Sequence, residues 1–391
     1  MDIPALTEQL SKLAEGSPEG LPEEQRLALV EALTNARSAV SSPLEKMIDL
    51  LLAPHDAIAA RLAVDMGLMD IALAHGGPVT ATTLAEKSKA DIELVRRIMR
   101  FMTGMSFFKE EDADLYTPLP TGLTFLAPGS PLRECVIHLV DGYPATASMP
   151  TFFKKTAWRN PNDAYNGPWQ HAYRTPGQHF FEQLDERSVH ALSVVMSLQP
   201  RGTGTQWYDV WPTEEKLKVD DADRAVFVDV AGGVGHETKA FAERFPSLPG
   251  KIFLTDLPQV LVSVPSTLPS SITLVPHDFF KTPFPAPLQG AKAYYMRAVL
   301  HDWPDTQARS ILSNIRNVMV DDSLLLINEV VLPEKGTTLW HARQDFQMMA
   351  HCASGERTER QWRGLVQSAG FEVVKIVEGK ETALIECVKK M

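Results

Sequence analysis

The chain contains 391 residues, of which 44% are hydrophobic and 22% are charged, as in an ordinary globular protein. This length is sufficient for two domains that each bury a core. The net charge is −11 and no basic block occurs, which argues against nucleic acid as a partner, because binding it requires many cations to neutralise phosphates. No apolar stretch approaches the ~20 residues of a membrane helix, and the N-terminus lacks the basic segment of a signal peptide.

The three cysteines, Cys135, Cys352 and Cys387, are far apart in the sequence. Their spacing fits neither a metal site nor a disulfide framework, and no His-Glu motif of a zinc enzyme occurs. We therefore expect reduced thiols, a cytoplasmic location, no bound metal and no membrane partner.

The N-terminal part of the chain predicts a helical extension over residues 1–42 followed by a winged-helix-like unit over 43–120. The expected elements are a helix over 23–40, helical spacing of apolar residues over 43–74, a short helix after Thr80, a helix over 91–103 and a β-hairpin over 107–116. Helix, helix and hairpin is the winged-helix order. Because basic residues are few here, packing or dimerisation is a better interpretation than DNA binding.

Residues 121–223 predict mainly helices that connect this unit to the last domain. The aromatic side chains of the segment are Phe152, Phe153, Trp158, Trp169, Phe180 and Phe181. Such a set usually belongs to a core, and part of it could line an apolar substrate pocket. Proline, glycine and charge then concentrate over 199–223, which predicts a domain junction.

From residue 224 to the end, strand-like and helix-like segments alternate. Strands are expected at 225–230, 252–255, 272–275, 293–296 and 324–329, with helices at 235–245, 259–264 and 305–320. This alternation predicts a doubly wound α/β fold with a parallel sheet covered on both faces. The last two strands, 371–377 and 383–388, are too close for a crossover helix and must form an antiparallel hairpin. The result is the seven-stranded, Rossmann-like sheet of methyltransferases.

A glycine-rich turn follows the first of these strands. The strand ends at Asp229, and Gly232, Gly233 and Gly235 precede the next helix, so that backbone N–H groups can approach a ligand closely. A dinucleotide fingerprint requires a third glycine where Thr238 stands, and the carboxylate of Asp229 would repel a pyrophosphate. The glycines alone are also compatible with an ordinary strand–helix turn.

Acidic residues also end the second and third strands, at Asp256 and Asp278. Asp256 is placed to accept hydrogen bonds from both hydroxyls of a ribose. Because the carboxyl ends of parallel strands share one edge of the sheet, the three acids face one crevice. They predict a nucleoside without phosphate, which is S-adenosylmethionine (SAM).

The run from Tyr294 to Asp305 contains His301-Asp302-Trp303 at the end of the fourth strand. Together with the turn at 229–235, Asp256-Leu257-Pro258 and Glu356-Arg357-Thr358, it resembles the plant- and fungal-type small-molecule O-methyltransferases. The fungal secondary-metabolism branch is the most similar, over nearly all of the chain from about residue 43. The resemblance implies a dimerisation domain at the N-terminus and hence a homodimer.

The resemblance also implies roles for individual residues. It places a general base at His301, oriented by Glu329 and Glu356, and a substrate-clamping methionine at Met348. Its cofactor positions are Asp229, Gly232, Gly233, Gly235, Asp256, Leu257, Asp278 and Phe279, with Arg297 on the methionine carboxylate and Trp303 on the adenine. Cys352 stands where the family often has asparagine, and Ala231 replaces a common glycine. Phe181, Asp302 and His138 complete the candidate substrate residues, although Asp302 could equally cap the helix that opens at Pro304.

These residues predict metal-independent methyl transfer to a phenolic or enolic hydroxyl of a small aromatic or polyketide-type molecule, with His301 taking the proton. Two alternatives remain open. In the first, SAM acts as a fixed positive charge while Arg297, His138 and His301 polarise a carbonyl in a dehydration or a pericyclic cyclisation. In the second, the chain is a non-enzymatic regulator, although a regulator has no reason to keep an acid–base set.

Overall fold

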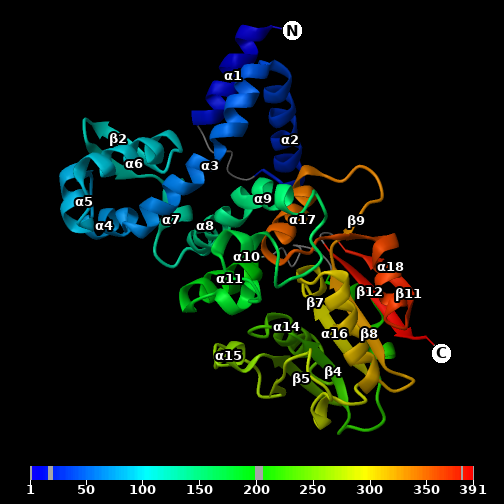
Figure 1. Ribbon diagram of the computed structural model, residues 1–391. Helices are drawn as coiled ribbons and strands as arrows, with labels where there is room; N and C mark the ends of the chain where they lie inside the picture. The colour runs from blue at the N-terminus through cyan, green and yellow to red at the C-terminus, as the bar shows by residue number, and fades with distance from the viewer. Residues whose placement is uncertain (1, 16–20, 199–205, 380–381, 391) are drawn as a thin grey trace.

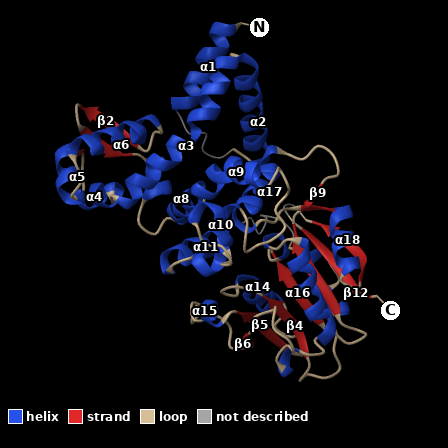
Figure 2. Cartoon of the chain, viewed as in Figure 1, coloured by secondary structure: helices blue, strands red, loops and turns tan. Residues whose placement is uncertain are grey.

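The structure is a computed structural model that describes residues 2–15, 21–198, 206–379 and 382–390. Helices make up the N-terminal half of the chain, and the strands of one large sheet gather in the C-terminal half (Figure 1, Figure 2). None of the helices in these ranges combines the length and hydropathy needed to cross a bilayer. The α/β fold with a helical N-terminal part is therefore confirmed.

Three helices form the N-terminal extension and its continuation, α1 (Ile3–Glu15), α2 (Glu23–Val40) and α3 (Pro43–Asp65). The predicted helix over 23–40 is confirmed as α2, and α1 is a further helix in the first half of the extension, where the sequence predicts no particular helix bounds. Ser42 begins α3 with a capping box, in which its hydroxyl accepts from Glu45 N and the Glu45 carboxylate accepts from Ser42 N. The helical pattern over 43–74 is divided at Gly67, whose φ of 64° ends one helix and starts the next.

The winged-helix unit is confirmed. Its elements are α4 (Leu68–His75), β1 (Val79–Thr80), α5 (Ala81–Ser88), α6 (Ile92–Gly104), β2 (Phe108–Asp112) and β3 (Leu115–Pro118). Thr80 and Asp91 cap α5 and α6 through side-chain oxygens, as the sequence predicts. β1 adds a third, antiparallel strand to the predicted hairpin, in the order β1-β3-β2.

The middle segment is mainly helical. Its elements are α7 (Pro120–Leu126), α8 (Pro131–Asp141), α9 (Tyr143–Lys155), α10 (Pro168–Tyr173), the 3₁₀ helix η1 (Phe180–Gln183) and α11 (Glu186–Leu198). Trp169 and Phe180 are buried together with Met149 on α9. Trp158, in contrast, is 74% exposed, so the aromatic set is not wholly a core. Residues 199–205, part of the predicted junction, lie outside the described residues.

The C-terminal part contains the seven-stranded sheet. Its strands are β4 (Ala225–Val230), β5 (Lys251–Asp256), β6 (Ile272–Pro276), β7 (Ala293–Arg297), β8 (Leu324–Glu329), β11 (Phe371–Glu378) and β12 (Ala383–Lys389), in the order β11-β12-β8-β7-β4-β5-β6. β12 pairs antiparallel with both β8 and β11, and the other pairs are parallel. The predicted sheet and its terminal hairpin are thus confirmed. A small parallel pair, β9 (Val331–Leu332) with β10 (Arg357–Thr358), was not predicted.

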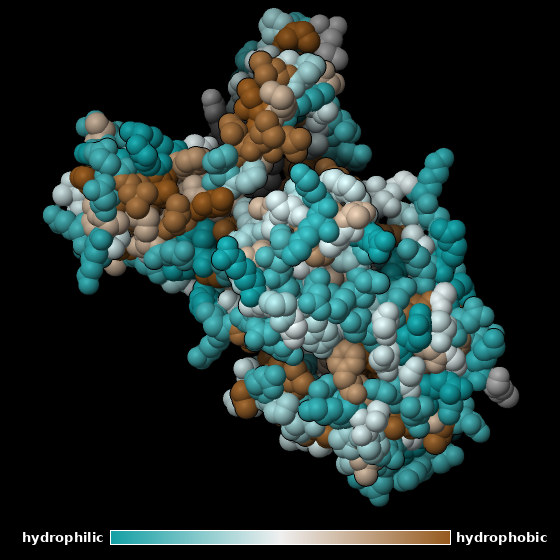
Figure 3. All heavy atoms as spheres, viewed as in Figure 1, coloured by the Kyte–Doolittle hydropathy of each residue, from teal (hydrophilic) through white to brown (hydrophobic). Residues whose placement is uncertain are grey.

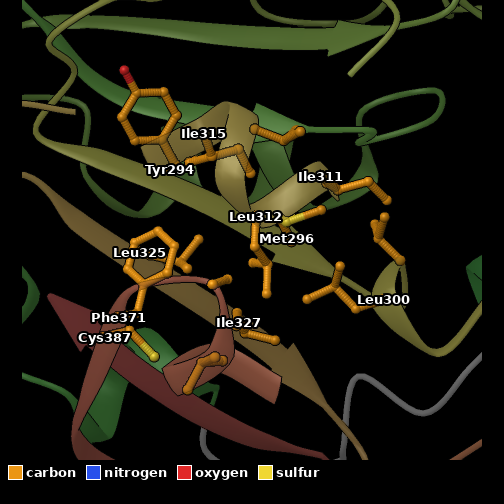
Figure 4. Close-up of a cluster of buried hydrophobic side chains, with 14 of the residues drawn as sticks. Tyr294, Met296, Leu300, Ile311, Leu312, Ile315, Leu325, Ile327, Phe371 and Cys387 are labelled. Atoms are coloured by element: carbon orange, nitrogen blue, oxygen red, sulfur yellow. The ribbon is translucent and has the colours of Figure 1, made fainter. Parts of the chain in front are cut away.

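Helices cover both faces of this sheet. They are α12 (Trp207–Val210), α13 (Thr213–Lys216), α14 (His236–Arg244), α15 (Pro258–Leu261), α16 (Asp305–Val318) and α18 (Glu359–Ser368), with the 3₁₀ turns η2 (Ala286–Leu288) and η3 (Leu300–Asp302). The remaining helix, α17 (Leu339–Cys352), packs against α9 and α10 instead. Figure 4 shows the α16 side chains Ile311, Leu312 and Ile315 packed toward Met296 and Ile327 of the sheet. The opposite face buries aromatic side chains of α12 and α14. This double layer leaves the carboxyl ends of the parallel strands free to build a site.

Candidate active site

The glycine-rich turn after β4 is shaped by close contacts. A Cβ on Gly232 would lie 2.5 Å from Asp229 Cγ, and one on Gly235 would lie 2.7 Å from Leu254 Cδ2. Ala231 adopts a φ of 58°, in the left-handed region that favours glycine. A side chain at either of these two glycines would therefore clash, whereas a Cβ on Gly233 would meet no atom within 4 Å.

Two of the predicted acids are held by this turn. Asp229 is 1% exposed and accepts a hydrogen bond from Thr238 Oγ1 at 2.5 Å. Burial raises the pKa of Asp229 to about 7, while the Thr238 bond opposes this shift. Asp256 accepts from Gly233 N at 2.8 Å and from Leu257 N at 2.7 Å, which ties the turn to β5. Thr238, which stands where a dinucleotide fingerprint would have glycine, thus also positions the carboxylate of Asp229.

The third acid, Asp278, directly precedes two aromatic residues that pack against Trp303. Asp278 accepts from Phe280 N at 3.0 Å, and its side chain remains 28% exposed. The edges of Phe279 and Phe280 contact Trp303, at ring-centroid distances of 5.8 and 4.8 Å. Trp303 is 5% exposed, and one of its faces is covered by the His179 ring, stacked at 4.2 Å and 13°. His179 was missed by the sequence analysis.

Arg297 is not a free cation at the end of β7. Its guanidinium lies 2.9 Å from Glu237 Oε1, and both side chains are 12% exposed. Tyr295 OH donates to Glu237 at 3.4 Å and accepts from Asn328 Nδ2 at 2.9 Å. Glu237, in the first turn of α14, was also missed, and it already neutralises the charge that was expected to meet the methionine carboxylate.

The three predicted catalytic residues do lie together. His301 belongs to η3 and is 8% exposed, with Nδ1 at 3.0 Å from Glu356 Oε1 and at 3.9 Å from Glu329 Oε2. The other Glu329 oxygen accepts from Val299 N at 2.9 Å and from Leu300 N at 2.8 Å, which fixes the loop before the histidine. The arrangement directs Nε2 of the imidazole away from both glutamates.

A further residue holds the histidine loop from outside. The Arg357 guanidinium is 6% exposed and donates to Leu300 O at 2.8 Å and to Trp303 O at 2.7 Å. It also donates to Asp305 at 3.0 Å. The motif Glu356-Arg357-Thr358 could have indicated this role, because adjacent residues of the motif support the ring and the loop of the same histidine.

The electrostatics of this cluster favour a charged imidazole. Burial disfavours the charged form of His301, but three surrounding carboxylates outweigh burial and raise its pKa to about 10. These carboxylates are those of Glu329, Asp302 and Glu356. Asp302 Oδ1 lies 3.7 Å from Nε2, on the side opposite the glutamates, and burial raises the pKa of Asp302 to about 6. His301 is consequently a strong base that rests protonated at neutral pH.

The same three side chains also have the spacing of a metal site. Among the described residues, donor atoms of His301, Glu329 and Glu356 all lie within 4.8 Å of one another. Glu329 already accepts two backbone N–H bonds and Glu356 accepts from the imidazole, which suits the orientation of a base. A reaction without metal stays a prediction.

The candidate substrate residues fall into one connected region beside Asp302. Cys352 Sγ lies 3.7 Å from Asp302 Oδ1 and is buried in the cluster that contains Trp169 and Phe180. His351 stacks on Phe180 at 5.3 Å, and His138 meets His351 edge-on at 6.3 Å. Burial lowers the pKa of both histidines, that of His351 to about 3. Both rings are thus neutral and line an apolar region.

Two further candidates border this region. Met348 is partly buried on α17, one turn before Cys352, and Phe181 is 37% exposed in η1. η1 also follows His179, which covers Trp303. The short helix η1 therefore connects the predicted substrate residues to the aromatic residues around Trp303.

Comparison with known proteins identifies two domains. A family model described as the O-methyltransferase domain matches residues 215–372, and one described as the O-methyltransferase dimerisation domain matches residues 48–128. The chain is 31% identical to demethylsterigmatocystin 6-O-methyltransferase from Aspergillus flavus over 343 residues, which cover 86% of each protein.

Solved structures match over the full length. LepI in complex with SAM aligns with a TM-score of 0.81 and 28% identity, covering 99% of both chains. A structure described as a pericyclic reaction enzyme aligns with the same TM-score of 0.81, identity of 28% and coverage of 99%. Proteins similar to this chain are thus described both as an O-methyltransferase and as a pericyclic reaction enzyme.

Proposed function

The chain belongs to the O-methyltransferase family and is an enzyme that uses SAM, and we propose that it methylates a phenolic or enolic hydroxyl of a small aromatic or polyketide-type molecule. The observation that carries this proposal is the buried His301, held at Nδ1 by Glu356 beside the carboxyl ends of the strands. That combination supports a proton acceptor at the edge of the sheet where Asp229, the glycine turn and Asp256 form the proposed cofactor cradle.

The residues of the cradle fit SAM. The glycine turn packs closely on Asp229 at Gly232, whereas a Cβ at Gly233 would meet no atom within 4 Å, which leaves space for a ligand there. Asp229, buried at the end of β4, suits a cationic amino group. Each oxygen of Asp256 accepts one hydrogen bond from the described residues and can accept another from a ribose hydroxyl. When bound, SAM supplies a methyl group activated by a sulfonium.

His301 performs the proton transfer in this proposal. Its Nε2 accepts the proton of the acceptor hydroxyl, and Glu356 stabilises the resulting imidazolium through Nδ1–H. An imidazole of ordinary pKa, about 6.5, would take a proton from a phenol of pKa about 10 at a cost of about 5 kcal/mol. The pKa of His301, about 10, matches that of such a phenol, so the transfer itself is nearly balanced, and the cost that remains at neutral pH is that of freeing Nε2. The region around Asp302 and Cys352 orients the acceptor for attack on the methyl group.

The proposal is tested with purified protein, methyl-labelled SAM and a panel of phenols and enolic polyketides. We expect label in the product and one S-adenosylhomocysteine (SAH) formed per product molecule. Product that forms without SAH and without label would refute methyl transfer and favour a pericyclic reaction or a dehydration. That second candidate draws support from the pericyclic enzyme of similar structure and from the neutral His138 and His351 in an apolar region.

We also propose that the enzyme is a homodimer. The matched dimerisation domain supports this, as do exposed apolar residues of α3 such as Leu50, Leu51 and Leu52, which are 74%, 62% and 52% exposed. Figure 3 shows hydrophobic side chains gathered over the N-terminal helices. Light scattering should give twice the chain mass of 43.3 kDa, and a monomer mass would refute the proposal.

A further inference from the structure

His179 carries a buried hydrogen-bond donor that no acceptor in the described part of the chain meets. The side chain is 2% exposed, and its Nε2 has no hydrogen-bond partner among the described residues. Its Nδ1 accepts from Phe181 N at 3.3 Å, so the ring proton resides on Nε2. Buried polar groups nearly always find partners, and one that lacks a protein partner indicates a bound ligand or water.

The position of this donor is fixed from both sides. The backbone N–H of His179 donates to the Glu182 carboxylate at 3.1 Å, which closes the cap of η1. The imidazole stacks on Trp303 at 4.2 Å and lies edge-on to Tyr165 at 5.7 Å. Burial lowers the pKa of His179 to about 4, so the ring is neutral and offers one N–H.

The surroundings belong to the adenine end of the cradle. Trp303 contacts Phe279 and Phe280, the two residues that follow Asp278 at the end of β6. Tyr165 packs on both His179 and Trp303. Burial raises the pKa of Tyr165, and the charges of Glu182 and then Asp278 add to the rise. The groups expected at the methionine end, Asp229 and Arg297, lie at β4 and β7.

We propose that His179 is a ligand of the cofactor, whose Nε2–H donates to a ring nitrogen of the adenine, while its ring braces Trp303 in the wall of the same site. Ring nitrogens N1, N3 and N7 of adenine are acceptors without protons, and a neutral N–H donor matches any of them. The inference deepens the cofactor assignment and rests on the adenine lying at Asp278 and Phe279. It adds a residue from the middle segment to a cradle otherwise built by the C-terminal sheet.

The test is calorimetric binding of SAH and of its 1-deaza, 3-deaza and 7-deaza analogues, in which C–H replaces one ring nitrogen. We expect the native protein to lose about 10-fold in affinity for one of the three analogues, because its buried donor is then unpaired. His179→Phe keeps a ring against Trp303 but has no donor. It should bind SAH about 10-fold more weakly and no longer distinguish that analogue. His179→Gln, which can return a donor, should restore part of the discrimination, and the exposed His190→Gln should behave as the native protein.

Two results would overturn the inference. If His179→Phe binds SAH and all analogues in the native pattern, the donor does not meet the adenine. If the variant instead raises KM for the acceptor with unchanged SAH affinity, the donor serves the acceptor site. Failure of the native protein to bind SAH at all is a separate outcome, which would refute the cofactor cradle as well. Thermal unfolding of each variant identifies any loss of folding.

Discussion

Replacing Glu356 by glutamine removes one negative charge beside His301 and keeps an oxygen that can accept from Nδ1–H. At the 3.0 Å between Nδ1 and Glu356 Oε1, a pair of unit charges contributes about 5 kcal/mol at an effective dielectric constant of about 20. This energy equals about four pKa units and is an upper limit. Glu329 remains 3.9 Å from Nδ1 and still favours the charged ring in the variant. We therefore expect the pKa of His301 to fall by less than this limit but by at least about one unit.

The sign of the effect on activity follows from the role of the imidazole. His301 accepts a proton, so kcat/KM rises with pH until the free imidazole predominates. In the native enzyme this acid limb reflects a pKa of about 10, lowered by the positive charge of bound SAM. In Glu356→Gln the limb should move to lower pH, and the plateau should fall because the imidazolium of the transition state is less stabilised.

The assay is kcat/KM for the acceptor at saturating SAM, from about pH 6 to about pH 10.5. The exposed Glu372→Gln should keep the native limb, and any limb caused by ionisation of the acceptor itself should appear unchanged in every variant. Identical limbs for the native enzyme and Glu356→Gln would refute the argument that this carboxylate sets the basicity of His301.

Three other variants test separate parts of the site. His301→Ala should lower kcat by about 10²- to 10⁴-fold while SAH affinity in calorimetry stays unchanged, and an unchanged rate would remove it as the base. Gly232→Ala would place a Cβ 2.5 Å from the carboxyl carbon of the β4 aspartate. We expect this variant to bind SAH at least about 10-fold more weakly. The control Gly104→Ala has open space around its Cβ and should bind SAH as the native protein does. Arg357→Met should lower the free energy of unfolding in urea by at least about 2 kcal/mol. The exposed Arg363→Met should lower it by less than about 0.5 kcal/mol. Equal losses would contradict the role of Arg357 in holding the histidine loop.

Most of the framework of the site could be predicted because it depends on local sequence. β4 and β8 lie at their predicted bounds, since each begins with four consecutive apolar residues and is buried along its whole length. The strand-end acids Asp229 and Asp256 follow from the same runs. The motif around His301 needed a resemblance to a known family, because its glutamate partners lie on other elements.

The missed residues share one property, which is a partner distant in the sequence. Glu237 neutralises Arg297 from the first turn of another element, and His179 covers Trp303 from the middle segment. Neither contact leaves a periodicity or a spacing in the sequence that would indicate it. The break at Gly67 was missed for a different reason, since apolar spacing continues through it while only the backbone changes.

The carboxylates around His301 also bear on which acceptors suit the enzyme. With a pKa of about 10, the imidazole is protonated at neutral pH before the acceptor arrives. An ordinary phenol of pKa about 10 would then need the enzyme to release a proton first, at a cost of about 4 kcal/mol at pH 7. A more acidic phenol or an enol enters as its anion, and Nε2–H of the imidazolium holds the oxygen in place by a charge-assisted hydrogen bond. The same protonated ring is the group that a pericyclic or dehydrating enzyme would use to polarise a carbonyl. The acidity of the acceptor, rather than a different set of residues, therefore decides how this site uses its histidine.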